Sequence, residues 1–266
     1  MNRSSKLLCP LALAAAMTGA STLAQAAGPT LAASDLGLST AQLQNLLGLG
    51  APGGHPGIAF GSPIGYGANW GTLGAAIGGQ TLPDTAQDDV DGSMGLVAGF
   101  GDATNAIGLE VIVNIISLQD NFGEDGAFSA KLHRMLGDST SIAIGVEGAG
   151  GWGAADNVDE TYYAVGTHVL PVAETDMSLA INLGVGDGRF DDRGEDRASL
   201  IAGMALVVHP QVSTIVDWSG STLNAGVSTV PLRGLPLTLS LGAINLTERN
   251  NGDIEFAGSV GYSLFF

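Results

Sequence analysis

Apolar and polar residues alternate along much of this chain. In residues 106–118, Leu109, Val111 and Val113 occupy every second position, with Glu110 and Asn114 among the residues between them. Successive side chains of a β-strand point in opposite directions, so this period of two is typical of strands whose two faces meet different surroundings.

The same period predicts twelve strands. Each is expected to be about ten residues long, which exceeds the usual five or six of soluble strands and matches a tilted crossing of a bilayer. The connections alternate between longer, acidic ones and shorter ones, with one tight exception at Ser219 and Gly220. The expected strands cover residues 70–81, 92–101, 106–118, 126–134, 140–151, 160–170, 176–187, 197–208, 211–219, 221–231, 235–245 and 254–266.

The last expected strand ends in an aromatic residue. Val260, Tyr262, Leu264 and Phe266 occupy its alternate positions. In this feature the chain resembles bacterial outer-membrane β-barrels, whose last strand commonly ends in phenylalanine after alternating apolar residues. The resemblance implies that Tyr262, Leu264 and Phe266 form an assembly signal, which the β-barrel assembly machinery reads before this strand closes the barrel.

We therefore expect an all-β fold, a single antiparallel transmembrane β-barrel of about 12 strands over residues 66–266. Within lipid every backbone amide needs an internal partner, which leaves helices or closed barrels. The most apolar stretch, residues 106–118, is too short for a spanning helix. The expected location is the outer membrane, with its lipids as partners. Trp70, Trp152, Tyr163, Trp218 and Phe266 are expected in aromatic belts at the membrane interfaces.

The first residues predict export. Arg3 and Lys6 precede an apolar stretch, and Ala24-Gln25-Ala26 has the pattern of a cleavage site, so residues 1–26 are expected to be a signal peptide. The one cysteine of the sequence, Cys9, lies in this segment. Thiol and disulfide chemistry is therefore not expected in the mature chain.

Residues 27–65 lack the alternation. Ser39 and Gln42 form a capping box before Leu43, which predicts a short N-terminal helical segment followed by a linker rich in glycine and proline. This segment could fill the barrel lumen, lie in the periplasm or form a loosely ordered tail.

Composition and charge narrow the class of protein. Charged residues make up 13% of the chain, about half the usual share, whereas hydrophobic residues make up 45%. A secreted β-sandwich would also alternate, but its outer face would need more charge than this sequence provides. The net charge of −17 argues against nucleic acid as a partner, because phosphates attract cations.

Two acidic clusters lie in the expected outer loops. The first lacks the later ligands of a calcium loop, and three arginines are interleaved with the second. Solvated loops are one interpretation, and divalent cations that bridge to lipid headgroups are the other. The residues are Asp88, Asp89 and Asp91 in the first cluster, and Asp187, Arg189, Asp191, Asp192, Arg193, Glu195, Asp196 and Arg197 in the second.

No catalytic motif accompanies the histidines. His55, His133, His168 and His209 lack the spacing of zinc ligands, and none lies beside a nucleophile signature. An outer-membrane lipid-acting hydrolase with a serine–histidine pair is disfavoured, because His133 and His168 are placed on the inward face. The sequence thus leads us to expect no enzyme, no cofactor and no metal site.

Strand parity assigns a set of polar side chains to the lumen. They suggest a narrow passive channel for small hydrophilic solutes or cations, in which carboxylates give a preference for cations. The alternative is a structural or adhesive barrel with a filled lumen, in which the same side chains pair with one another. The candidates are Glu110, Asn114, Lys131, His133, Glu147, His168, Asn182, Asp217, Asn224 and Glu255.

Overall fold

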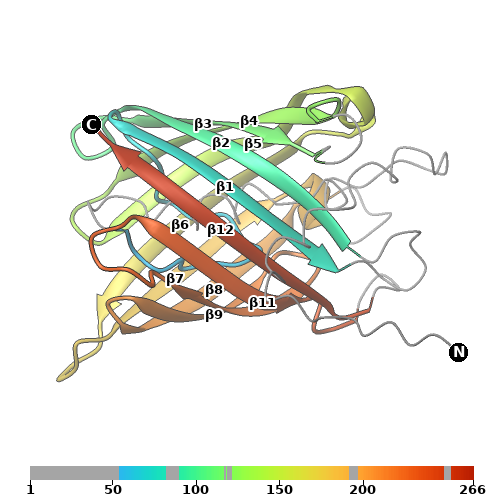
Figure 1. Ribbon diagram of the computed structural model, residues 1–266. Helices are drawn as coiled ribbons and strands as arrows, with labels where there is room; N and C mark the ends of the chain where they lie inside the picture. Colours follow the sequence, from blue (N-terminus) through green and yellow to red (C-terminus); the bar gives the residue numbers. More distant parts are fainter. Residues whose placement is uncertain (1–53, 82–89, 117, 119–121, 192–196, 249–252) are drawn as a thin grey trace, which may run out of the picture.

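A computed structural model describes residues 54–81, 90–116, 118, 122–191, 197–248 and 253–266. The predicted signal peptide and the predicted helix around Ser39 lie outside the described residues. Within them, twelve strands form one closed antiparallel barrel, as predicted (Figure 1). They are β1 Thr72–Thr81, β2 Val90–Gly101, β3 Gly108–Ile115, β4 Gly126–Met135, β5 Thr140–Trp152, β6 Thr161–Pro171, β7 Ser178–Gly186, β8 Ser199–His209, β9 Val212–Trp218, β10 Leu223–Thr229, β11 Leu237–Ile244 and β12 Glu255–Phe265.

Each strand pairs with its neighbours in sequence, and β1 pairs with β12 to close the barrel. The closing register runs from Thr72 opposite Phe265 to Gln80 opposite Ala257. Closure leaves no free strand edge, which satisfies the backbone polar groups of every strand on both sides.

The barrel has two different ends. The end with the shorter connections, here called the turn end, carries residues 102–107, 136–139, 172–177, 210–211 and 230–236 together with the C-terminus. The other end, here called the loop end, carries the longer connections and two short 3-10 helices, η3 Gly153–Asn157 and η4 Gly188–Phe190. The predicted alternation of connections is therefore confirmed. Its tight exception also lies at the loop end, where the Ser219 amide donates to the Thr222 carbonyl oxygen.

The outer surface of the barrel is an apolar belt. Large side chains such as Ile144, Leu183 and Leu241 are 58–64% exposed, as lipid-facing residues of an isolated barrel should be. The inward positions carry smaller or polar side chains, many of them fully buried. Among the described residues, no helix is long and apolar enough to cross a membrane.

Aromatic side chains gather at both rims. At the turn end the Trp70 ring lies 6.2 Å from Phe100 and 6.4 Å from Phe266. At the loop end Phe128 and Trp152 pack with ring centroids 5.4 Å apart. Tyr163 is a correction to the predicted belts. It points into the lumen, 5% exposed, on the same face of β6 as the buried Val165 and Thr167.

The contacts of Phe266 suggest a test of the predicted assembly signal. Its amide donates to the Gly71 carbonyl oxygen, and its ring packs against Trp70 where β1 meets β12. Deletion of Phe266 should lower the folded fraction, because the last contacts of the closing pair are lost. Heat-modifiable migration of membrane extracts measures this fraction.

Phe256→Ala is the matched control, since this aromatic residue is also largely exposed and lies near the opposite end of the same strand. Normal folding of the Phe266 deletion would contradict the assembly-signal prediction.

Candidate functional site in the barrel lumen

The lumen of the barrel contains a stretch of the chain itself. Residues 54–71, here called the inner segment, precede β1 and have no regular secondary structure. Gly54 lies against Pro236 and Val230 at the turn end. The chain then rises to Phe60 and Gly61, which contact Asp217 near the loop end of β9. It returns to the turn end, where Asn69 binds the amide of Ala103 (blue in Figure 1).

The barrel wall supplies hydrogen-bond partners to the backbone of this segment. An irregular chain without water needs such partners for its N–H and C=O groups. Small inward hydroxyl groups provide several of them. Ser228 Oγ accepts from the Gly57 amide at 2.8 Å, Thr167 Oγ1 accepts from the Gly65 amide at 2.7 Å, Ser141 Oγ donates to the Gly65 carbonyl at 2.6 Å, and Ser213 Oγ donates to the Gly57 carbonyl.

Asp217 holds the top of the inner segment. Its carboxylate, 1% exposed, accepts from the amides of Phe60 at 2.5 Å and Gly61 at 3.0 Å. Asn224, directly opposite on β10, donates to the same carboxylate at 2.9 Å. Three donors on one buried carboxylate replace the water it has lost, so the charge is stabilised by the segment that it binds.

A second buried cluster holds the returning half of the segment. Glu110 and Lys131 lie opposite each other on β3 and β4, and Lys131 Nζ lies 3.2 Å from Glu110 Oε1 in an ion pair. The other oxygen of Glu110 accepts from the Ala68 amide at 2.7 Å. Lys131 Nζ also donates to the Tyr66 carbonyl, and His133 Nε2 lies 3.1 Å from the Ala68 carbonyl. Glu110, Lys131 and His133 therefore each connect a strand of the wall to the backbone of the inner segment.

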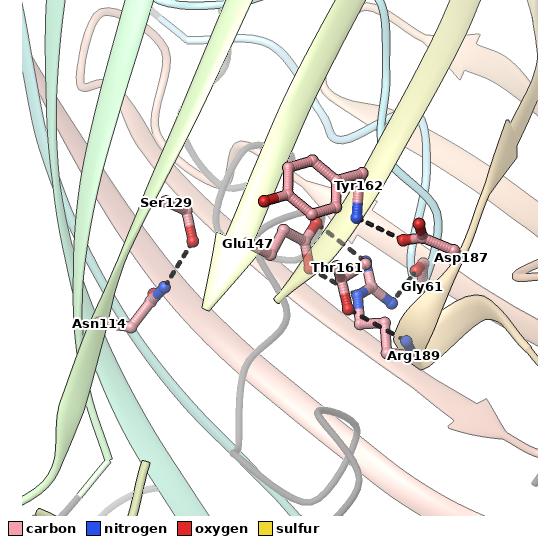
Figure 2. Close-up of polar contacts among 8 residues, drawn as sticks. All are labelled: Gly61, Asn114, Ser129, Glu147, Thr161, Tyr162, Asp187 and Arg189. Carbon is pink, nitrogen blue, oxygen red and sulfur yellow. Dashed lines mark hydrogen bonds and ion pairs between the residues drawn. The ribbon is translucent and has the colours of Figure 1, made fainter. Parts of the chain in front are cut away.

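A third group closes the lumen from the loop end. Arg189 of η4 turns inward and pairs with Glu147 of β5 through Nε–Oε2 at 2.5 Å and Nη2–Oε1 at 3.2 Å. Its Nη1 donates to the Gly61 carbonyl at 3.1 Å (Figure 2). The guanidinium also lies 4.0 Å from the centre of the Phe190 ring. Arg189, which the sequence placed in a solvated outer loop, is thus a lumen residue.

Nine of the sequence-predicted lumen residues point inward. Besides the groups above, Asn182 donates to the Ile58 carbonyl at 3.2 Å, and Asn114 donates to Ser129 at 3.2 Å (Figure 2). Glu255 accepts from Gln80 on the neighbouring strand at 3.1 Å. The nine are Glu110, Asn114, Lys131, His133, Glu147, Asn182, Asp217, Asn224 and Glu255.

His168 is a correction, because it lies on the outer face. Its Nδ1 is 2.7 Å from the hydroxyl of Thr140 on β5. Tyr163 and Val165 point into the lumen, so the alternate positions of β6, including His168, face outward. Each face of this strand mixes apolar and polar side chains, with Thr161 and Thr167 inside and His168 outside, so polarity alone could not identify which face lines the lumen.

The inward serines and threonines were missed as functional residues. The sequence analysis treated them only as the small residues of each strand's second face. Their role depends on the inner segment, which lies beside them in the folded barrel. The signal that could have found them is the Gly- and Pro-rich stretch before β1. A segment with few side chains of its own presents mainly backbone groups, and these match short hydroxyl side chains.

The acidic clusters do not form a site within the described residues. There, no group of three His, Cys, Asp or Glu residues could hold a metal ion. Asp187 accepts from the Tyr162 amide at 2.6 Å (Figure 2), and Asp191 accepts from Ser199 and from the Arg197 amide. The other members, Asp88, Asp89, Asp192, Arg193, Glu195, Asp196 and the side chain of Asp91, lie outside the described residues.

The remaining two histidines are separate from one another and from the lumen cluster. His55 contacts Thr238 through its carbonyl oxygen at 3.5 Å, and His209 Nδ1 accepts from the Gln211 amide at 3.2 Å. They do not join His133 or His168 in a shared site.

Comparison with known proteins gives a weak structural similarity. No protein-family model and no curated protein matches the sequence. Among solved structures, LpxR from Salmonella typhimurium is similar at 12% sequence identity and a TM-score of 0.36, over 73% of this chain and 100% of that chain. The class itself follows from the closed twelve-stranded barrel and its apolar belt, which confirm the predicted outer-membrane β-barrel.

The same comparison corrects one expectation. The sequence led us to expect no enzyme; that exclusion is contradicted by the similarity to LpxR and is withdrawn. At this identity and TM-score the similarity assigns no activity to this chain.

The Glu110–Lys131 pair gives a test of how the lumen is held. Lys131→Met should leave the Glu110 carboxylate buried without its cation and lower the free energy of unfolding by roughly 3–5 kcal/mol. The double variant Glu110→Gln/Lys131→Met should recover much of that loss, since neither charge remains. Urea unfolding in detergent micelles, followed by tryptophan fluorescence, measures both. Equal losses in the single and double variants would contradict the pairing.

Proposed function

We propose that this chain is a self-plugged outer-membrane barrel. At rest it is a closed, structural barrel that carries its longer connections at the membrane surface. It conducts small cations only when the inner segment leaves the lumen. The main support for this proposal is that the buried carboxylates of Asp217 and Glu110 accept hydrogen bonds from the backbone of this segment.

This proposal combines the two functions that the sequence left open. Polar inward side chains were expected either to line a water-filled path or to fill the lumen. Here several of them, including Glu110, Asp217 and Asn182, bond backbone groups of residues 57–68, so the path is occupied by the chain itself. The channel therefore depends on a movement of the inner segment, and the filled lumen describes the resting state.

The number and kind of bonds favour a closed resting state. The segment is bound by serine and threonine hydroxyls, by the carboxylates of β3 and β9, by the Asn182 amide of β7, and by cations from β4 and η4. A typical buried hydrogen bond contributes about 1 kcal/mol, and bonds to charged groups contribute more. Such a set makes spontaneous release of the whole segment rare.

Export through residues 1–26, divalent cations at the acidic loops and recognition by the assembly machinery remain predictions.

We infer the membrane orientation from the lengths of the connections. Outer-membrane barrels have short periplasmic turns and longer outer loops, so the turn end and both ends of the inner segment face the periplasm.

Planar bilayer recordings test the closed state. The unmodified protein should show no steady conductance, whereas deletion of residues 54–69 should give conductance steps, because the lumen loses its filling. Asp217→Asn should give intermittent openings, since a neutral amide binds the Phe60 and Gly61 amides more weakly.

Glu255→Gln is the matched control, because Glu255 accepts a bond from Gln80 of the barrel wall. It should stay as silent as the unmodified protein. Steady conductance of the unmodified protein, or silence of a correctly folded deletion variant, would contradict the proposal.

Selectivity of the opened barrel is a separate prediction. Glu110 and Glu147 are paired with Lys131 and Arg189, whereas Asp217 loses two of its donors when the inner segment is deleted. The opened barrel should prefer cations, and the preference should fade as salt screens charge over about 10 Å at 0.1 M. Adding Asp217→Asn to the deletion should lower the reversal potential. Anion preference of the deletion variant would refute this prediction.

A further inference from the structure

The outer face of the barrel has a hollow across strands β4 to β7. Its volume is about 540 Å³, and its walls are the apolar side chains of Leu132, Ile142, Ile144 and Leu183. Its floor is small because Ala164 and Gly166 take the outward positions of β6 between these larger neighbours. The neighbouring outward positions of the belt are filled by large side chains, so this is a local depression in a surface that faces lipid.

The strand register gives the hollow a direction. Arg134 lies opposite Ile142, Ile142 opposite Gly166, and Gly166 opposite Leu183. Arg134 is one residue from the turn end of β4, whereas Leu183 lies in the middle of β7. The row therefore runs obliquely from the rim of the barrel into the centre of the apolar belt.

A positively charged side chain, that of Arg134, lies at the end of the hollow nearest the rim of the barrel. Arg134 is exposed, lines the hollow and makes no side-chain hydrogen bond or ion pair with any described residue. Lys131 and Arg189, by contrast, are paired with carboxylates, and Arg233 bonds Gln211. His168 and Thr140 lie opposite each other on β6 and β5, two residues nearer the turn end than Gly166 and Ile142. They add polar groups beside Arg134.

From this arrangement we infer that the hollow binds one acyl chain of an anionic glycerophospholipid, whose phosphate is held by Arg134. An arginine presents several N–H donors to phosphate oxygens. The apolar trough begins at the same residue and leads toward the bilayer centre, as an acyl chain does from its headgroup. The lipid belongs to the leaflet at the turn end, the periplasmic leaflet in the orientation proposed above.

A second copy of this chain is the competing occupant of an apolar hollow. Charge disfavours it, because no carboxylate of the described residues lines the hollow to meet the Arg134 of a second copy. A phospholipid supplies an anion and an acyl chain together, whereas a protein surface would have to bring a carboxylate into the membrane interface.

Native mass spectrometry of the purified barrel, released from detergent, tests the inference. The probe is phosphatidylglycerol with long acyl chains, titrated against the full-length protein. The unmodified protein should retain one lipid saturably. Arg134→Gln should weaken retention about tenfold, the loss expected for a charge-assisted contact to phosphate. Arg233→Gln is the matched control, because Arg233 lies at the same end of the barrel, in the turn between β10 and β11, and bonds Gln211.

Filling the hollow provides a second, independent variant. An added Cβ at Gly166 would meet Ile142 at 3.8 Å, an ordinary contact, so Gly166→Leu should fold while occupying the trough. It should also lower lipid retention. Ala75→Leu, an outward small residue on β1 outside the hollow, is its control. Heat-modifiable migration checks that each variant is folded.

The outcomes separate the occupants. Retention that is unchanged in Arg134→Gln and Gly166→Leu would overturn the inference. Dimer peaks that disappear in Gly166→Leu would also overturn it, in favour of a second copy. Displacement of the lipid by inorganic phosphate alone, or equal retention of a short-chain phosphatidylglycerol, would show that the trough holds no acyl chain and would overturn that part of the inference. Failure of the plug experiments would leave these results unaffected.

Discussion

A polypeptide sealed inside a barrel must find hydrogen-bond partners there, and this requirement organises the lumen. The strands satisfy their own backbone groups through closure of β1 on β12. The inner segment has no such ladder, so its amides and carbonyls depend on side chains of the wall. Serine, threonine, asparagine and carboxylate groups at inward positions meet that demand. The polar lumen and the irregular segment are therefore two parts of one arrangement.

Burial of charge follows the same requirement. Glu110, Lys131 and Asp217 are at most 1% exposed, which is costly for isolated ions. Each is held by an opposite charge, by backbone amides of the inner segment or by a neighbouring amide side chain. Arg189 brings a further cation from the loop end to Glu147. The wall, the inner segment and η4 are thus connected through charged groups that none of them could bury alone.

The sequence predicted the barrel well, because a period of two reports directly which residues share a face. It found the strand number, the closing strand and most inward polar residues. It failed on β6, where Tyr163 and Val165 make the inner face as apolar as the outer one, and so misplaced His168. It could not choose among the fates of residues 27–65, since Gly- and Pro-rich stretches carry little periodic signal. Arg189 was missed because a loop residue reveals no direction until the loop is folded.

The path of the inner segment has a topological consequence. Gly54 and Asn69 both lie at the turn end, and the chain between them rises and descends within the lumen. Between these two residues the chain forms a hairpin-shaped insertion and not a thread that passes through the barrel. This stretch could enter or leave a fully closed barrel through one mouth, with no strand unpaired and no free end pulled through. Within the described residues, insertion of this stretch therefore needs no knotting, and its withdrawal can be as reversible as the formation of the hydrogen bonds that hold it.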